Sequence, residues 1–156
     1  MSLLALFQWL SHSAVGVYMQ QSQWAFAVVE TTHLLGLAAL GGSLIVVSLR
    51  ALGLLARIAS RQLARELLPI AILSFVAIAV SGVLMVSGEA LKCYYSPAFR
   101  AKMAALAIAL IISLPVYFEQ IRHRDERLPW WHRVGAALSL LSWLSVGIAG
   151  RAIGFL

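Results

Sequence analysis

The feature that most constrains this chain is a series of four long stretches that contain no Asp, Glu, Lys or Arg. They cover residues 31–49, 67–88, 103–118 and 134–150, which are 19, 22, 16 and 17 residues long. With its flanks, each stretch approaches the about 20 residues that a helix needs to cross about 30 Å of hydrocarbon. None alternates between apolar and polar residues as a membrane β-strand does. The pattern therefore predicts an all-α integral membrane four-helix bundle and excludes a soluble globular protein.

Composition supports a membrane setting. Charged residues are 12% of the chain and hydrophobic residues 62%, whereas charged residues make up roughly 25% of an ordinary soluble domain. We attribute the net charge of +6 to membrane orientation, so nucleic acid is not an expected partner. The single cysteine, Cys93, excludes an intrachain disulfide and a multi-cysteine zinc site.

Residues 1–29 carry no formal charge, but Gln, Ser and His side chains interrupt them too often for a further span. Apolar residues recur here at helical spacing, namely Leu3, Leu4, Phe7, Leu10 and Ala14. They predict an amphipathic helix over about 3–14 that lies in the membrane interface. With spans over about 25–49, 67–88, 97–118 and 132–154, it makes up one transmembrane domain over 1–156.

The distribution of Lys and Arg predicts the orientation. Eight of the 12 cations lie between spans one and two or between spans three and four. These eight are Arg50, Arg57, Arg61, Arg65, Arg122, Arg124, Arg127 and Arg133. The positive-inside rule places those two segments in the cytoplasm. We therefore expect a multi-pass protein of the bacterial inner (cytoplasmic) membrane, with periplasmic N- and C-termini.

Proline positions predict helix boundaries. Ser96 followed by Pro97 is typical of a helix N-cap and first helical position, so span three is expected to begin there. Pro69 falls in the predicted first turn of span two, where its missing backbone N–H is tolerated.

Ionisable residues gather in the outer half of the predicted bundle. Glu30 and His33 are three residues apart, on one face of span one. Counted from Trp24, they lie roughly 9 Å and roughly 13 Å along the helix, and Lys102 lies about 7 Å into span three. Glu89 and Arg151 come at the outer ends of spans two and four. Because ionisable groups in a membrane are costly, this convergence predicts a functional site.

A b-type haem site is the interpretation that accounts for all of these residues. His33 would be the metal ligand, because imidazole in an apolar bundle suits haem iron, and Arg100, Lys102 and Arg151 would hold the propionates. Glu30 would orient His33 or relay a proton. A second interpretation is structural: Glu30 pairs with Lys102 or Arg151, and His33 donates to a backbone carbonyl.

The other histidines carry weaker predictions. His12 lies on the same side as His33 and is a candidate second metal ligand. His123 and His132 flank the charged inner segment RHRDERLPWWHR and are expected at a solvated surface. Cys93 lies in the second loop beside two tyrosines, where we expect an inert thiol.

The string ETTHLLGLAALGGSLIVVSLRALGL in span one resembles the signature of an uncharacterised bacterial family of small four-span membrane proteins. The resemblance continues through SPAFRAKM and LSWLSVGIAGR, so it covers nearly the whole chain. It implies a four-span fold and carries no established activity.

More distantly, the early histidine, the Gly-rich first span and the Lys at the start of span three are similar to two other groups. One is the haem-binding four-helix protoporphyrinogen oxidase, whose resemblance implies that His33 binds haem and that Lys102 is a functional cation. Its characteristic Trp-rich first span and aromatic-Leu-Pro-Arg stretch are absent, so its activity is not carried over. The other is the CopD-type copper-resistance membrane protein, whose resemblance implies copper handling, although Met19, Met85 and Met103 form no Met-rich motif.

Three hypotheses follow. The leading one is a b-type haem protein in electron transfer or quinol-linked redox chemistry, with a quinone or a periplasmic redox protein as partner. The second is a transporter in which Glu30 and His33 bind a proton or a copper ion. The third is a non-catalytic subunit of a larger membrane complex. A homodimer sharing the site across a glycine-lined face is compatible with the first.

Overall fold

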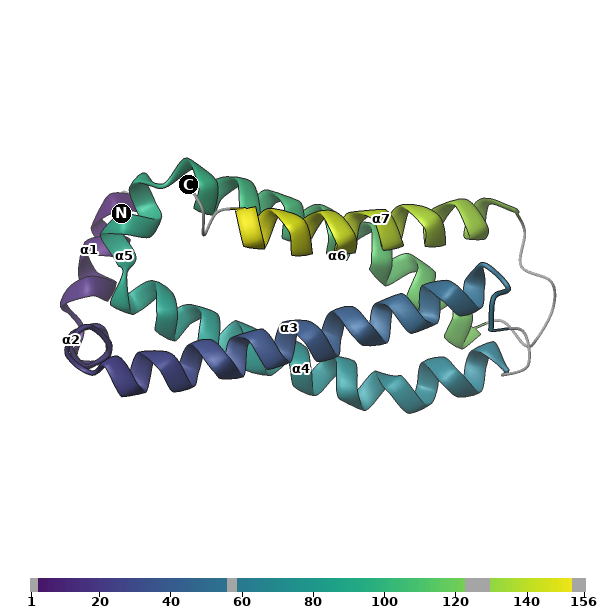
Figure 1. Ribbon diagram of the computed structural model, residues 1–156, viewed down its shortest axis with the longest axis horizontal. Helices are drawn as coiled ribbons and strands as arrows, with labels where there is room; N and C mark the ends of the chain where they lie inside the picture. The colour runs from purple at the N-terminus through teal and green to yellow at the C-terminus, as the bar shows by residue number, and fades with distance from the viewer. Residues whose placement is uncertain (1–2, 56–58, 123–129, 153–156) are drawn as a thin grey trace. The chain divides into compact units, whose positions relative to one another are not determined.

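The computed structural model describes residues 3–55, 59–122 and 130–152, and of residues 60 and 146–152 it describes the backbone alone. All regular structure in these ranges is helical, as predicted (Figure 1). The helices are α1 Leu3–His12, α2 Ala14–Gln21, α3 Gln23–Ala51, α4 Ser60–Gly88, α5 Ala90–Tyr95, α6 Pro97–Arg122 and α7 Trp130–Ala152.

Three helices among the described residues are long and apolar enough to cross a membrane. They are Gln23–Ala51, Arg61–Gly88 and Pro97–Arg122, and their most apolar windows have mean hydropathies of 1.9, 2.5 and 2.0. Many of their large apolar side chains are exposed, including Leu35, Leu73 and Ile111 at 65%, 71% and 70%. Apolar side chains on the outside of long helices suit contact with lipid, so the chain belongs in a bilayer.

Two helix boundaries have a clear local cause. At Ser96, the side-chain oxygen accepts a hydrogen bond from the Phe99 N–H at 3.2 Å, and α6 begins at Pro97, which confirms the predicted cap. At the end of α3, Gly53 has a φ of 90°. Its N–H donates to the Arg50 carbonyl and the Leu54 N–H to the Leu49 carbonyl, at 3.0 and 3.1 Å. These two bonds form a Schellman motif, which ends the helix.

Two helix boundaries differ from the expected ones. Pro69 lies inside α4, because the charged segment before it is helical from Ser60 onward and extends the helix beyond the apolar span. The N-terminal helix ends at His12 rather than near residue 14. Ser13 has extended backbone, and its side chain accepts from the Gly16 N–H at 3.0 Å, so a second helix, α2, begins there.

The chain divides into two compact units, which we describe separately. Unit 1 comprises residues 1–38 and 73–100, and unit 2 comprises residues 39–72 and 101–156. The long helices α3 and α4 each contribute one half to unit 1 and the other half to unit 2.

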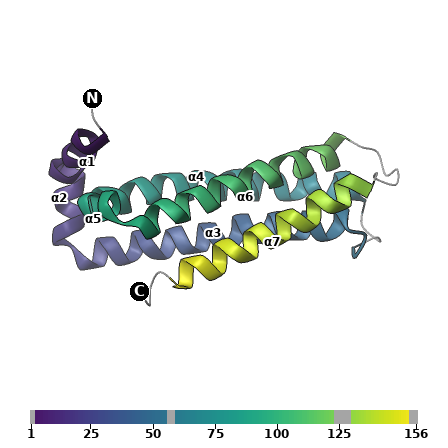
Figure 2. The same ribbon diagram turned by 90° about the horizontal axis from the view of Figure 1, so that it is seen from above.

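Unit 1 combines the short N-terminal helices with the first half of α3 and the second half of α4. Helix α1 lies beside α5 (Figures 1 and 2), where the rings of Phe7 and Tyr94 have centroids 5.5 Å apart. Helices α3 and α4 run antiparallel and approach closely at Gly36. A Cβ at Gly36 would lie 2.9 Å from the Ile78 Cγ1 and 3.3 Å from the Ser74 carbonyl oxygen. Glycine therefore sets the helix spacing here.

Unit 2 packs α6 and α7 antiparallel (Figure 2) with the second half of α3 and the first half of α4. Its buried apolar cluster contains Ala51, Val116 and Ala136, with Leu52 packed against it. A Cβ at Gly135 would lie 3.2 Å from the Val116 Cγ2, so small residues again allow close contact between helices.

Candidate functional site

His33 is the centre of the candidate site in unit 1. It lies in the first half of α3, half-buried, and its Nδ1 is 2.9 Å from the Oγ of Ser81 on α4. Ser81 is buried at 3% exposure. The interaction therefore joins two different helices within the apolar part of the unit.

The hydrogen bonds of Ser81 assign the tautomer of His33. The Ser81 hydroxyl donates to the Ala77 carbonyl at 2.5 Å, so its single proton is already committed. The Ser81 oxygen must then accept from His33, whose Nδ1 carries the proton. In a neutral imidazole the lone pair consequently lies on Nε2, which is the arrangement found in imidazoles that ligate metals.

Two glycines shape the surroundings of His33. Gly82 follows Ser81, and a Cβ there would lie 3.3 Å from the His33 Cε1. The imidazole edge therefore packs directly on the α4 backbone surface. Gly36, one turn after His33, holds α3 and α4 close together. The ring is thus fixed by a hydrogen bond at Nδ1 and by packing at Cε1.

The other predicted ligands are divided between the units. Glu30, one turn before His33, and Arg100 are exposed in unit 1. Lys102 is half-buried in unit 2. Arg151 also belongs to unit 2, and its side chain lies outside the described residues. The convergence of all five side chains remains a prediction.

The weaker candidates are spread along the chain. His12 is exposed at the end of α1, and Cys93 is half-buried in α5, where a loop was expected. His132 is half-buried and has its ring centroid 5.9 Å from that of Trp131. His123 lies outside the described residues. Within the described ranges, no group of three or more His, Cys, Asp or Glu side chains is arranged to hold a metal ion.

A buried polar cluster in unit 2 was missed by sequence reasoning. The Trp143 Nε1–H donates to the Ser113 Oγ at 2.9 Å, and the Ser113 and Ser139 hydroxyls lie 2.7 Å apart. Ser48 donates to the Ser139 Oγ at 3.2 Å. All four residues are buried. The cluster joins α3, α6 and α7 by hydrogen bonds that water cannot replace in an apolar surrounding.

Two polar residues of α6 add further interhelical bonds. The Tyr117 hydroxyl donates to the Ala64 carbonyl at 2.7 Å, and the Gln120 Nε2 donates to the Val47 carbonyl at 2.6 Å. The Gln120 Oε1 is buried and has no hydrogen-bond partner among the described residues. The available sequence signal was the position of Ser113, Tyr117 and Gln120 at helical spacing on one face of an apolar span.

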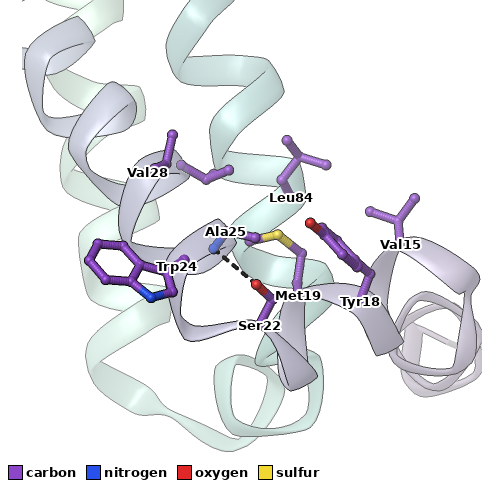
Figure 3. A pocket seen from close by; sticks show the side chains of 9 residues that line it. Val15, Tyr18, Met19, Ser22, Trp24, Ala25, Val28 and Leu84 are labelled. Carbon is purple, nitrogen blue, oxygen red and sulfur yellow. Dashed lines mark hydrogen bonds between the residues drawn. The ribbon is translucent and has the colours of Figure 1, made fainter.

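An open groove lies near His33 in unit 1. We call it the outer groove (Figure 3). Its volume is about 450 Å³. Its walls come from α2, the segment after it, the first two turns of α3 and one residue of α4. They are Val15, Tyr18, Met19, Ser22, Trp24, Ala25, Val28, Val29 and Leu84.

The helices and the site define an all-helical membrane protein with an oriented intramembrane histidine. More specifically, the chain belongs to a family of unknown function, DUF6644, whose model matches residues 6–156. This confirms the resemblance to an uncharacterised family. No curated protein and no solved structure matches the chain.

Proposed function

We propose that this protein binds a b-type haem through His33 and serves electron transfer in a bacterial inner membrane. The observation that supports this proposal is the 2.9 Å hydrogen bond between His33 Nδ1 and the Ser81 Oγ, which orients the imidazole and, in its neutral form, places the lone pair on Nε2. An ionisable side chain inside a membrane lowers the stability of the protein, so an oriented histidine there favours a functional role.

The donor set fits a porphyrin. The porphyrin ring supplies four nitrogens to its iron, so one or two protein ligands complete the coordination. His33 can act as that ligand by itself, and Ser81 supplies the outer hydrogen bond that fixes the imidazole plane. When bound, haem supplies reversible one-electron chemistry. Exposed His12 is the candidate for a second ligand.

The cations and Glu30 have auxiliary roles in this proposal. Arg100, Lys102 and Arg151 would pair with the two propionates, since guanidinium and ammonium groups form strong charge-assisted hydrogen bonds with carboxylates. Glu30, exposed one turn from His33, would exchange protons with the periplasmic side. The positive-inside distribution supports that topology, with both termini periplasmic and the α1 helix in the interface.

The electron partner in this proposal is a membrane quinone or a periplasmic redox protein. Both can reach the outer half of the membrane, where the positive-inside rule puts His33. A homodimer would enlarge a haem cavity that one small bundle can barely provide. Gly42 on α3, where an added Cβ would have nothing within 4 Å, leaves room for such a contact.

An absorption spectrum tests the proposal directly. The protein, expressed with adequate haem and purified in detergent, should show a Soret band, and reduction should sharpen its visible bands. His33→Ala should abolish the Soret band, whereas His132→Ala in unit 2 should keep it. Absence of the band, or an unchanged spectrum in His33→Ala, would contradict the proposal. Copper-dependent thermal stabilisation without a Soret band would favour the metal-handling alternative.

A further inference from the structure

We propose that the outer groove binds the ring of a membrane quinone. This inference rests on the proposed function, because it locates the electron partner beside the proposed haem ligand. Three observations on unit 1 support it: the chemistry of the groove lining, the two hydroxyl groups in that lining, and the short distance along α3 and α4 from lining residues to His33 and Ser81.

The groove lining fits a neutral, apolar ligand. None of its nine residues is charged, and most are aliphatic or aromatic. Its volume of about 450 Å³ falls within the roughly 300–1,000 Å³ of small-molecule sites. A phospholipid headgroup carries a phosphate that this lining would leave unpaired, whereas a quinone ring carries no charge. The chemistry therefore favours the quinone.

Aromatic and hydroxyl groups meet at the groove. Tyr18 and Trp24 are largely exposed and offer flat surfaces for a planar ring. Figure 3 shows the Tyr18 hydroxyl directed toward Leu84. The Ser22 Oγ accepts from the Ala25 N–H at 3.2 Å, so its own proton can be donated elsewhere. Tyr18 and Ser22 thus offer two hydroxyl donors to the carbonyl oxygens of a quinone.

Two lining residues of the groove lie close in sequence to His33 and Ser81. Val29 lines the groove and precedes His33 by four residues on α3. Leu84 lines it and follows Ser81 by three residues on α4. Because α3 and α4 are antiparallel, the step from Val29 to His33 and the step from Leu84 to Ser81 run in the same direction. Each step covers about one helical turn of 5.4 Å. A ring in the groove would therefore lie about one turn from the His33–Ser81 pair.

Tryptophan fluorescence tests this proposal without requiring haem. Decylubiquinone should quench the haem-free His33→Ala protein saturably in phosphatidylcholine nanodiscs. Trp24→Phe, made in the same His33→Ala protein, should remove the saturable part of the fluorescence quenching. Trp9→Phe is the matched control, because Trp9 is also exposed in unit 1 but lies on α1 outside the groove, and it should keep the saturable part.

Groove-filling variants give a second readout. Val28→Trp should weaken decylubiquinone binding at least tenfold, since Val28 lines the groove and is exposed enough to accept a larger side chain without disturbing the core. Val80→Trp, at a similarly exposed position of α4 outside the groove, should leave the affinity unchanged. Tyr18→Phe should weaken it about three- to tenfold through loss of a hydrogen bond.

Several outcomes would overturn the proposal. If the quenching never saturates, the groove does not hold the quinone. The same conclusion follows if Val28→Trp and Val80→Trp bind decylubiquinone with equal affinity. Loss of the saturable part when phosphatidylglycerol replaces phosphatidylcholine shows that the groove is a phospholipid site. The two proposals fail separately: a Soret band without quinone binding refutes only the groove, and saturable quinone binding without a Soret band refutes only the haem.

Discussion

His33 Nδ1 and Ser81 Oγ lie 2.9 Å apart, and the Ser81 hydroxyl also donates to the Ala77 carbonyl. This pair of bonds makes Ser81 an acceptor from His33 and connects the imidazole of α3 to the backbone of α4. One small hydroxyl thereby assigns the histidine tautomer and joins two helices within unit 1.

Removing Ser81 should therefore weaken unit 1 measurably. We expect Ser81→Ala to lower the free energy of unfolding by about 0.5–1.5 kcal/mol, the range of interhelical hydrogen bonds in membranes. Ser87→Ala is the control, because Ser87 is about equally buried on α4 and, among the described residues, its side chain bonds only the Leu84 carbonyl of its own helix. Thermal unfolding in detergent measures both. An equal loss in the two variants would mean that the His33 bond adds no stability.

The serine cluster of unit 2 should be more sensitive. Ser139 is completely buried and takes part in bonds with both Ser48 and Ser113, so Ser139→Ala should cost about 1–2 kcal/mol. Ser43→Ala provides the comparison, because Ser43 is buried and, within the part of the chain that the structure describes, donates only to the Ala39 carbonyl of its own helix. Unfolding by denaturant should separate the two variants. A Ser43→Ala loss as large as that of Ser139→Ala would contradict the interhelical role.

Gln120 should tolerate an apolar replacement better than Tyr117 tolerates loss of its hydroxyl. Gln120→Leu removes the 2.6 Å bond to Val47 but also removes the buried Oε1, which has no partner among the described residues. The two effects oppose each other, so we expect a change within about 1 kcal/mol. Tyr117→Phe loses its bond to the Ala64 carbonyl without such compensation. Parallel thermal melts would refute this ranking if Gln120→Leu proved the less stable variant.

Two glycines of α3 should respond oppositely to alanine. At Gly36 an added Cβ meets Ile78 and the Ser74 carbonyl within 3.3 Å, so Gly36→Ala must push α3 and α4 apart and destabilise the protein by about 1–3 kcal/mol. At Gly42 an added Cβ has nothing within 4 Å. Gly42→Ala should be neutral or stabilise the helix by up to about 1 kcal/mol. Melting temperatures that fall equally in both variants would contradict the packing at Gly36.

Local sequence chemistry predicted some boundaries well and others poorly. The start of α6 followed from Ser96 and Pro97, because an N-cap and a first-turn proline act within three residues. Pro69 was misplaced because the charged residues before it suggested a helix start, whereas α4 continues through them from Ser60. Hydrophobic length marks where a helix enters lipid, and a helix can extend beyond that point.

The sequence by itself determined that this protein is helical and suited to a membrane, because long uncharged stretches in lipid must satisfy their backbone groups internally. It also singled out His33 as a costly residue in an apolar span. Only the tertiary structure decided which groups meet: Ser81 with His33 across 48 residues, and Ser48 with Ser139 across 91. Many serines in an apolar helix can bond their own backbone. Which of them bonds a neighbouring helix depends on how the helices pack, and helix packing lies beyond local sequence pattern.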